Sequence, residues 1–128
     1  MITVLCGIIV NTEGEIFIAR RKPGKSFAGK WEFPGGKLEE GESESDCLKR
    51  ELLEELGMQV QVGERLGENV HHYPTFSIRL IAYHCRFVSA SYQLTDHDLY
   101  AWVKEEEFVN YDLAEADVPL VDFFIRFK

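Results

Sequence analysis

Hydrophobic residues gather in a few extended stretches, separated by turns rich in glycine and polar residues. Residues 2–10 are β-branched and almost continuously apolar, which predicts a buried strand. The polar turn at 11–15 and the apolar stretch at 16–20 extend this strand into a hairpin. Further strand segments are predicted at residues 31–33, 58–70, 76–88, 92–94 and 99–103.

The segment from Ser43 to Gly57 has the apolar period of a helix. Leu48, Leu52 and Leu56 recur at intervals of four and predict the buried stripe. Ser43 is suited to cap the helix, with Asp46 in place of the usual glutamate of a capping box. Gly57 supplies the left-handed residue that ends it.

A second helix is predicted within residues 115–127, with Pro119 in its first turn. Its apolar face would consist of Val118, Val121, Phe124 and Ile125. No repeat, low-complexity segment or linker interrupts the pattern. Strands mixed with two helices therefore predict an α+β fold in a single domain spanning residues 1–128.

Acidic side chains lie beside the apolar stripe of the first predicted helix. Glu51, Glu54 and Glu55 share one helix face, and Glu44 falls one to two turns earlier on the same side. Such carboxylates repel one another, and a divalent cation such as Mg²⁺ relieves the repulsion while keeping waters for a phosphate ligand. Taken alone, the acidic run is better explained by a solvated acidic face, the usual role of a charge run.

A sharp break is predicted just before this helix, at Pro34-Gly35-Gly36. The two glycines let the backbone approach closely, so that a loop carbonyl could join the carboxylates around a metal ion. Arg50 could brace one of the carboxylates from the side.

Composition narrows the possible partners. The formal net charge of −8 repels polyanions, so binding to a nucleic-acid polymer is not expected, whereas metal ions could still mediate contact with a nucleotide. The three scattered cysteines predict neither a disulfide framework nor a zinc site and favour a reducing, cytoplasmic setting. No apolar run is long enough to predict a membrane span, and residues 1–10 fit a strand better than a signal peptide.

The spacing of certain residues between Gly36 and Met58 distinguishes the acidic helix from an ordinary run of charges. The glycine, Glu42, Arg50-Glu51-Leu52, Glu54-Glu55 and Gly57-Met58 stand at the positions of the Nudix box. The chain resembles the Nudix hydrolase family over nearly its full length. Three further segments are similar to the MutT-type branch, at 18–21, 31–37 and 113–119. The resemblance implies an α/β/α sandwich with a mixed, curved β-sheet between helices.

The resemblance also implies an activity. Enzymes of this branch hydrolyse a nucleoside triphosphate to the monophosphate and pyrophosphate with Mg²⁺, Mn²⁺ being possible, and are linked to nucleotide pool sanitation and DNA repair. Glu51, Glu54 and Glu55 would be catalytic metal ligands, joined by the carbonyl of Gly35. Two alternatives are a Nudix hydrolase for another nucleoside diphosphate derivative and a non-catalytic nucleotide-binding module. The chain is expected to act as a monomer or homodimer.

By the same resemblance, the general base comes from the loop before the last strand. The matching position is Asp96, where relatives carry Glu, so the carboxylate is one methylene shorter. Asp98 is the alternative, and an ordinary turn residue is an equally good interpretation of Asp96.

The implied substrate-binding residues surround the glycines. Arg21 and Lys37 would contact phosphate, since both are cations. Glu32, Phe33 and Pro34 match the wall of a nucleotide pocket, with Gly35 beside them, although Phe33 could equally be a core residue.

Asp117 stands where an 8-oxo-dGTP hydrolase has Asn. An ionised Asp only accepts hydrogen bonds, which suits the exocyclic amine of cytosine or the N–H groups of guanine. Both 8-oxo-dGTP and a cytidine or 5-methylcytidine triphosphate therefore stay open as substrates, and Asp117 could also cap the second helix. The histidines at 71, 72, 84 and 97 lack metal-ligand spacing and are expected at the surface or at a pocket rim.

Overall fold

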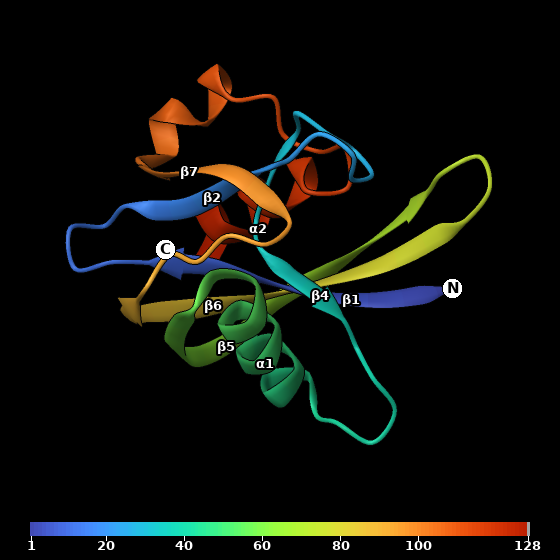
Figure 1. Ribbon diagram of the computed structural model, residues 1–128, viewed down its shortest axis with the longest axis horizontal. Helices are drawn as coiled ribbons and strands as arrows, with labels where there is room; N and C mark the ends of the chain where they lie inside the picture. Colours follow the sequence, from blue (N-terminus) through green and yellow to red (C-terminus); the bar gives the residue numbers. More distant parts are fainter. Residues whose placement is uncertain (128) are drawn as a thin grey trace.

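A mixed β-sheet lies between two helices in the computed structural model, which describes residues 1–127 (Figure 1). The central strands run in the order β3-β2-β1-β6-β5, with β4 paired to β1 and β7 paired to β2. Only β1 and β6 pair in parallel; the other pairs are antiparallel. The elements are β1 (Ile2–Val10), β2 (Ile16–Arg21), β3 (Trp31–Glu32), β4 (Gly35–Lys37), α1 (Glu44–Leu56), β5 (Met58–His72), β6 (Ser77–Ala90), β7 (His97–Val103), the 3₁₀ helix η1 (Glu105–Asn110) and α2 (Val118–Phe127).

Alternate residues of β1 and β2 enter two hydrophobic cores on opposite faces of the sheet. Leu5 and Ile9 of β1 pack with the buried leucines of α1. Cys6 and Ile8 point the other way, into the core that contains Leu120 of α2. Both faces of these strands are covered, and for this reason the sequence is apolar at nearly every position rather than at every second one. The α+β sandwich predicted from the sequence is confirmed.

The first helix forms as predicted. The Oγ of Ser43 accepts a hydrogen bond from the backbone N–H of Asp46 at 3.1 Å. Leu48, Leu52 and Leu56 are fully buried. Gly57 has a φ of 59° and its N–H donates to the carbonyl of Leu53, so it ends the helix in the left-handed conformation.

The Pro-Gly-Gly segment differs from the prediction. Gly35–Lys37 forms the short strand β4, paired antiparallel with Val4–Cys6 of β1, where the sequence predicted only a break. This pairing fastens the loop before α1 to the centre of the sheet. In addition, β7 begins at His97, two residues before the predicted start, and residues 92–94 are not a strand.

The second helix begins at Val118, and its buried face was predicted only in part. Phe124 is buried and Val121 packs against the same core, as predicted, and Leu120 is also buried. Val118 and Ile125 are 53% and 44% exposed, so the prediction was wrong for these two residues. No helix within residues 1–127 is long and apolar enough to cross a membrane.

Candidate active site

A cavity of about 660 Å³ opens between the β4 segment, the start of β1, the loop after β2 and the β5–β6 hairpin. Its lining has a polar part and a largely apolar part. The polar lining includes Arg21, Glu32, Lys37, Glu51 and Glu55. The apolar lining includes Cys6, Phe33, Ile78, Leu80 and Ala116, with Asp117 among them.

The two glycines of β4 bring the sheet against the acidic helix. A Cβ on Gly35 would lie 2.7 Å from the Cα of Cys6 in β1. A Cβ on Gly36 would lie 2.7 Å from the Cγ of Glu51 and closer still to its carboxylate. Any larger residue at either position would therefore push the strand from β1 or the carboxylate from the cavity wall.

Arg50 holds the carboxylates next to the cavity in a fixed arrangement. Its guanidinium donates twice to Glu42, at 2.7 and 3.0 Å, and once each to Glu51 at 2.8 Å and Glu54 at 3.3 Å. The hydrogen bonds from Arg50 lower the pKa of Glu42 to about 2, with help from the backbone N–H of Glu39. The bracing role predicted for Arg50 is thus confirmed, and it extends to several carboxylates.

Glu55 lies deeper than its neighbours and close to Asp96. Burial, hydrogen bonding with Asp96 and the negative charge of Glu51 together raise the pKa of Glu55 to about 9. Burial also acts to raise the pKa of Asp96, but hydrogen bonding to Lys25 and Glu55 outweighs it, so that pKa lies below its usual value. These opposite shifts favour a protonated Glu55 beside an ionised Asp96.

These residues fit a hard divalent cation. The Oε2 of Glu55 is buried and has no hydrogen-bond partner. An unpaired buried carboxylate oxygen is costly unless a cation or proton compensates it. Among residues 1–127 no three acidic, imidazole or thiol side chains already form a metal cage. Glu51 and Glu54 both form ion pairs with Arg50. Oxygen donors of this kind suit Mg²⁺ or Mn²⁺.

Two acidic residues considered in the sequence lie away from this cluster. Glu44 lies at the start of α1, about two turns before Glu51, and accepts a hydrogen bond from the hydroxyl of Tyr83 at 2.7 Å, so it is engaged outside the cluster. Asp98 forms a two-pronged ion pair with Arg20, at 2.7 and 2.9 Å. Between the two candidates for the base, only Asp96 adjoins Glu55.

Asp117 lies in the apolar part of the cavity and is almost fully buried. Its Oδ2 accepts a hydrogen bond from the backbone N–H of Phe33 at 2.8 Å. Burial and the negative charge of Glu32 hold its pKa well above the usual range, which favours the neutral acid. A neutral carboxyl can donate as well as accept, so the accept-only behaviour of an ionised Asp does not describe this site.

Phe33 both lines the cavity and packs in the core, so the two sequence interpretations apply together. Pro34 is buried and its carbonyl accepts from the N–H of Gly7, so it supports the wall from behind. Lys37 is exposed at the rim, and Arg21 lies 3.7 Å from Glu32.

His97 is a buried residue that the sequence analysis placed incorrectly at the surface or a pocket rim. It is 3% exposed, and its Nε2 lies 2.9 Å from Oε2 of Glu32, which lines the cavity. The ring therefore fixes the side chain of Glu32 from behind. Alternation along β7 would not have identified it, because Leu99 is 47% exposed and the register shifts at this end of the strand.

Three aromatic residues at the cavity mouth, Phe27, Tyr73 and Phe76, were also missed. They come from two turns far apart in sequence, and no local pattern links them. Only the tertiary structure brings them together.

Comparison with known proteins agrees with this geometry. A family model described as the NUDIX domain matches residues 5–122. A CTP pyrophosphohydrolase of Escherichia coli is 38% identical over 128 residues, which cover 100% of this chain and 94% of the relative. An 8-oxo-dGTP diphosphatase of Haemophilus influenzae is 41% identical over 83 residues, covering 65% of this chain and 61% of the relative. The crystal structure of a MutT protein from Methanosarcina mazei superposes with a TM-score of 0.85 at 30% identity, over 98% of this chain and 91% of that one.

Proposed function

The chain belongs to the Nudix hydrolase family, and we propose that it hydrolyses nucleoside triphosphates to the monophosphate and pyrophosphate. The observation that carries the proposal is the convergence of Glu51, Glu55 and the glycine strand β4 on one cavity. The names of the similar enzymes, a CTP pyrophosphohydrolase and an 8-oxo-dGTP diphosphatase, support the same reaction class.

A divalent cation fits the carboxylate part of the cavity. Glu51, Glu54, Glu55 and the carbonyl of Gly35 would hold it. When bound, Mg²⁺ or Mn²⁺ neutralises phosphate charge and lowers the pKa of a bound water. The pairing of Arg50 with Glu51 and Glu54 keeps these carboxylates beside the cavity.

The chain's own residues bind the triphosphate and move one proton. Arg21 and Lys37 line the cavity and offer positive charge to the phosphates. Asp96, the carboxyl with the lowered pKa, takes the proton of the attacking water. The water oxygen bonds to phosphorus as the α–β anhydride bond breaks, and pyrophosphate leaves in line with the attack.

The nucleobase of the substrate lies at the apolar part of the cavity, where Phe33 and Asp117 form the wall. A neutral Asp117 can donate to the 8-oxo group or accept from the amine of cytosine. We therefore propose both 8-oxo-dGTP and cytidine or 5-methylcytidine triphosphates as substrates to be compared. The three cysteines are free and buried, which supports a reducing, cytoplasmic setting.

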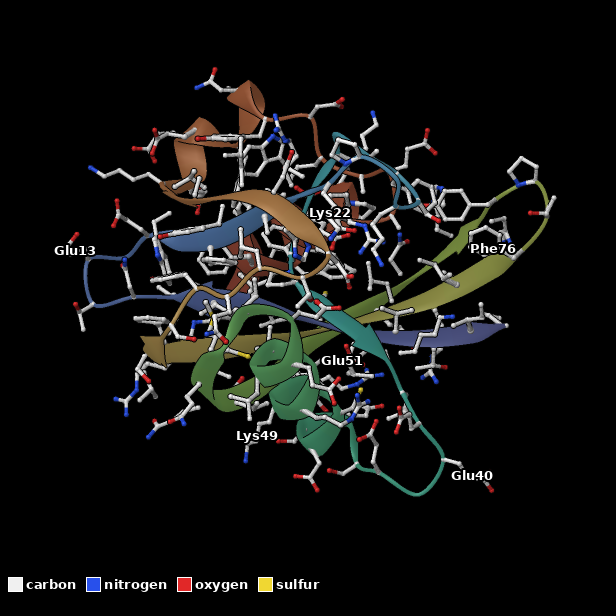
Figure 2. The ribbon with its side chains drawn as sticks, in the orientation of Figure 1. Glu13, Lys22, Glu40, Lys49, Glu51 and Phe76 are labelled. Carbon is white, nitrogen blue, oxygen red and sulfur yellow. The ribbon has the colours of Figure 1, made fainter. Side chains whose placement is uncertain are left out.

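A steady-state comparison of 8-oxo-dGTP, dGTP, CTP, dCTP and 5-methyl-dCTP with Mg²⁺ tests the proposal. Glu54→Gln is expected to keep the fold and to lose nearly all turnover. Glu40→Gln is the matched control, because Glu40 is exposed on the loop between β4 and α1 (Figure 2) and is not among the residues that line the cavity. The proposal fails if wild type releases no pyrophosphate from any of these substrates, or if Glu54→Gln is as active as the control.

A further inference from the structure

The chain forms a tight turn directly after β2, from Lys22 to Lys25. The backbone N–H of Lys25 donates to the carbonyl of Lys22 at 3.3 Å, which closes the turn. Gly24 has a φ of 89°, as the third position of a type II turn requires, and Pro23 suits the second position. The turn begins at Lys22, which Figure 2 labels, and its geometry fixes where Lys25 stands relative to the end of β2.

Both ends of this turn contact Asp96. The backbone N–H of Lys22 donates to the carbonyl of Asp96 at 3.1 Å. The ammonium of Lys25 lies 3.1 Å from Oδ1 of the same residue. The turn therefore holds Asp96 once by its backbone and once by its carboxylate.

The segment that carries Asp96 is also tied to the end of α1. The backbone N–H of Thr95 donates to the carbonyl of Glu55 at 3.3 Å, and that of Ser91 donates to the carbonyl of Gly57 at 3.0 Å. The last carbonyls of a helix have no partner within the helix, so they can accept such bonds. The backbone at Asp96 is thus fixed relative to both β2 and Glu55.

With its backbone fixed, Asp96 can still rotate its carboxylate about two side-chain torsions. This carboxyl hydrogen-bonds with that of Glu55, and two acids at such a distance repel each other when both are ionised. Lys25 supplies the opposite charge at Oδ1, where the Asp96 side chain is only 27% exposed. The ion pair therefore favours one orientation of the Asp96 carboxylate beside Glu55.

We propose that Lys25 is a positioning residue, which holds the Asp96 carboxylate in the orientation that takes the proton of the attacking water. This inference rests on the proposed function for the role of Asp96. Lys25 is not among the residues that line the cavity, whereas Arg21 and Lys37 are. It therefore acts through Asp96 and not by binding the phosphates.

The first test compares Lys25→Met with Lys25→Arg, which keeps a positive charge. Lys25→Met is expected to lower kcat for the preferred triphosphate about tenfold and to leave KM unchanged. Lys25→Arg should recover most of the lost kcat, because a guanidinium can also pair with a carboxylate. Equal kcat values in Lys25→Met and wild type would overturn the proposal.

Lys30→Met is the matched control, because Lys30 belongs to the same loop and pairs with Asp112 at 3.0 Å. It should keep the kcat and KM of wild type. Inhibition by inorganic pyrophosphate should be the same in Lys25→Met and wild type. A weaker inhibition in Lys25→Met would mean that Lys25 binds phosphate directly, and would overturn its positioning role.

A double-mutant cycle shows whether Lys25 acts through Asp96. Rates are measured as single turnovers with enzyme in excess, so that a slow Asp96→Asn variant remains measurable. Adding Lys25→Met to Asp96→Asn should cause no further loss, since the carboxylate that Lys25 holds is already gone. The same tenfold loss in both backgrounds would refute action through Asp96.

Nuclear magnetic resonance of the metal-free protein tests the contact without turnover. The Cε signal of Lys25, identified by its loss in Lys25→Met, should shift in Asp96→Asn. It should not shift in Asp98→Asn, because Asp98 pairs with Arg20. An unshifted signal in Asp96→Asn rejects the pairing even if triphosphates are hydrolysed.

Failure of the proposed function gives a different result. A wild type that releases no pyrophosphate rejects the reaction and, with it, the catalytic use of the pair. An active wild type whose kcat is unchanged in Lys25→Met rejects the role of Lys25 alone.

Discussion

Adding one methyl group at each glycine of β4 should separate stability from catalysis. At Gly35 the new Cβ would press on the backbone of Leu5 and Cys6, which is fixed at the centre of the sheet. At Gly36 it would press only on the side chain of Glu51, which can rotate. Gly35→Ala should therefore mainly destabilise the protein, whereas Gly36→Ala should mainly displace a carboxylate.

The expected magnitudes follow from these contacts. Overpacking against an immobile backbone costs about 3 kcal/mol, at the upper end of the usual range. For a chain of this length that lowers Tm by roughly 10 °C. Turning Glu51 off its preferred rotamer costs only about 1 kcal/mol. A displacement of about 1 Å at a catalytic group can nevertheless reduce kcat about 100-fold.

Thermal unfolding followed by circular dichroism and pyrophosphate release under saturating substrate measure the two effects. Gly36→Ala should melt within a few degrees of wild type and be nearly inactive. Full activity in Gly36→Ala would show that the position of Glu51 against β4 is irrelevant to the reaction. A Gly35→Ala variant as stable as wild type would contradict the close packing of β4 on β1.

Three further predictions concern single side chains. Glu55 has a raised pKa, so the folded protein binds more protons than the unfolded chain between about pH 4.5 and 9, and stability falls as pH rises through that window. Glu55→Gln should therefore raise Tm by several degrees at pH 8 in EDTA and leave it unchanged near pH 4. Parallel curves of Tm against pH for the variant and wild type would contradict the buried proton. Glu42 has a lowered pKa, so its contribution to stability is present above about pH 4.5 and is lost as pH falls toward 2. Arg50→Gln should lower Tm by a few degrees at pH 7 and reduce the fall of Tm between pH 4.5 and 2. The same fall of Tm in the variant and wild type would argue against the Arg50 cluster. Asp117→Asn keeps an acceptor for the N–H of Phe33. It should nevertheless change the kcat/KM for CTP relative to the kcat/KM for 8-oxo-dGTP about tenfold. The same relative value in the variant and wild type would show that Asp117 does not contact the base.

The sequence by itself determined the reaction class and most of the fold. The glycine, glutamate and arginine spacing from Gly36 to Met58 is local, so it is legible without a structure. The same holds for α1, where a cap at Ser43, a leucine stripe and Gly57 all agree. The continuous apolar run of β1 likewise follows from burial on both faces of the sheet.

Only the tertiary structure decided which of these residues meet. Gly35–Lys37 resembles a plain break in sequence, yet pairing with β1 makes it a strand. His97 stands beside Glu32 because β7 pairs with β2 and β2 pairs with β3, a relation between segments far apart in the chain.

The largely apolar part of the cavity depends most on such long-range contacts. Asp117 is held there by the backbone of Phe33, and Phe27 meets Tyr73 across two loops. Local periodicity and short motifs carry no information about contacts of this kind, because each depends on the register of the whole sheet. The acidic motif was therefore encoded in one contiguous stretch, whereas the apolar wall of the cavity was assembled by the fold.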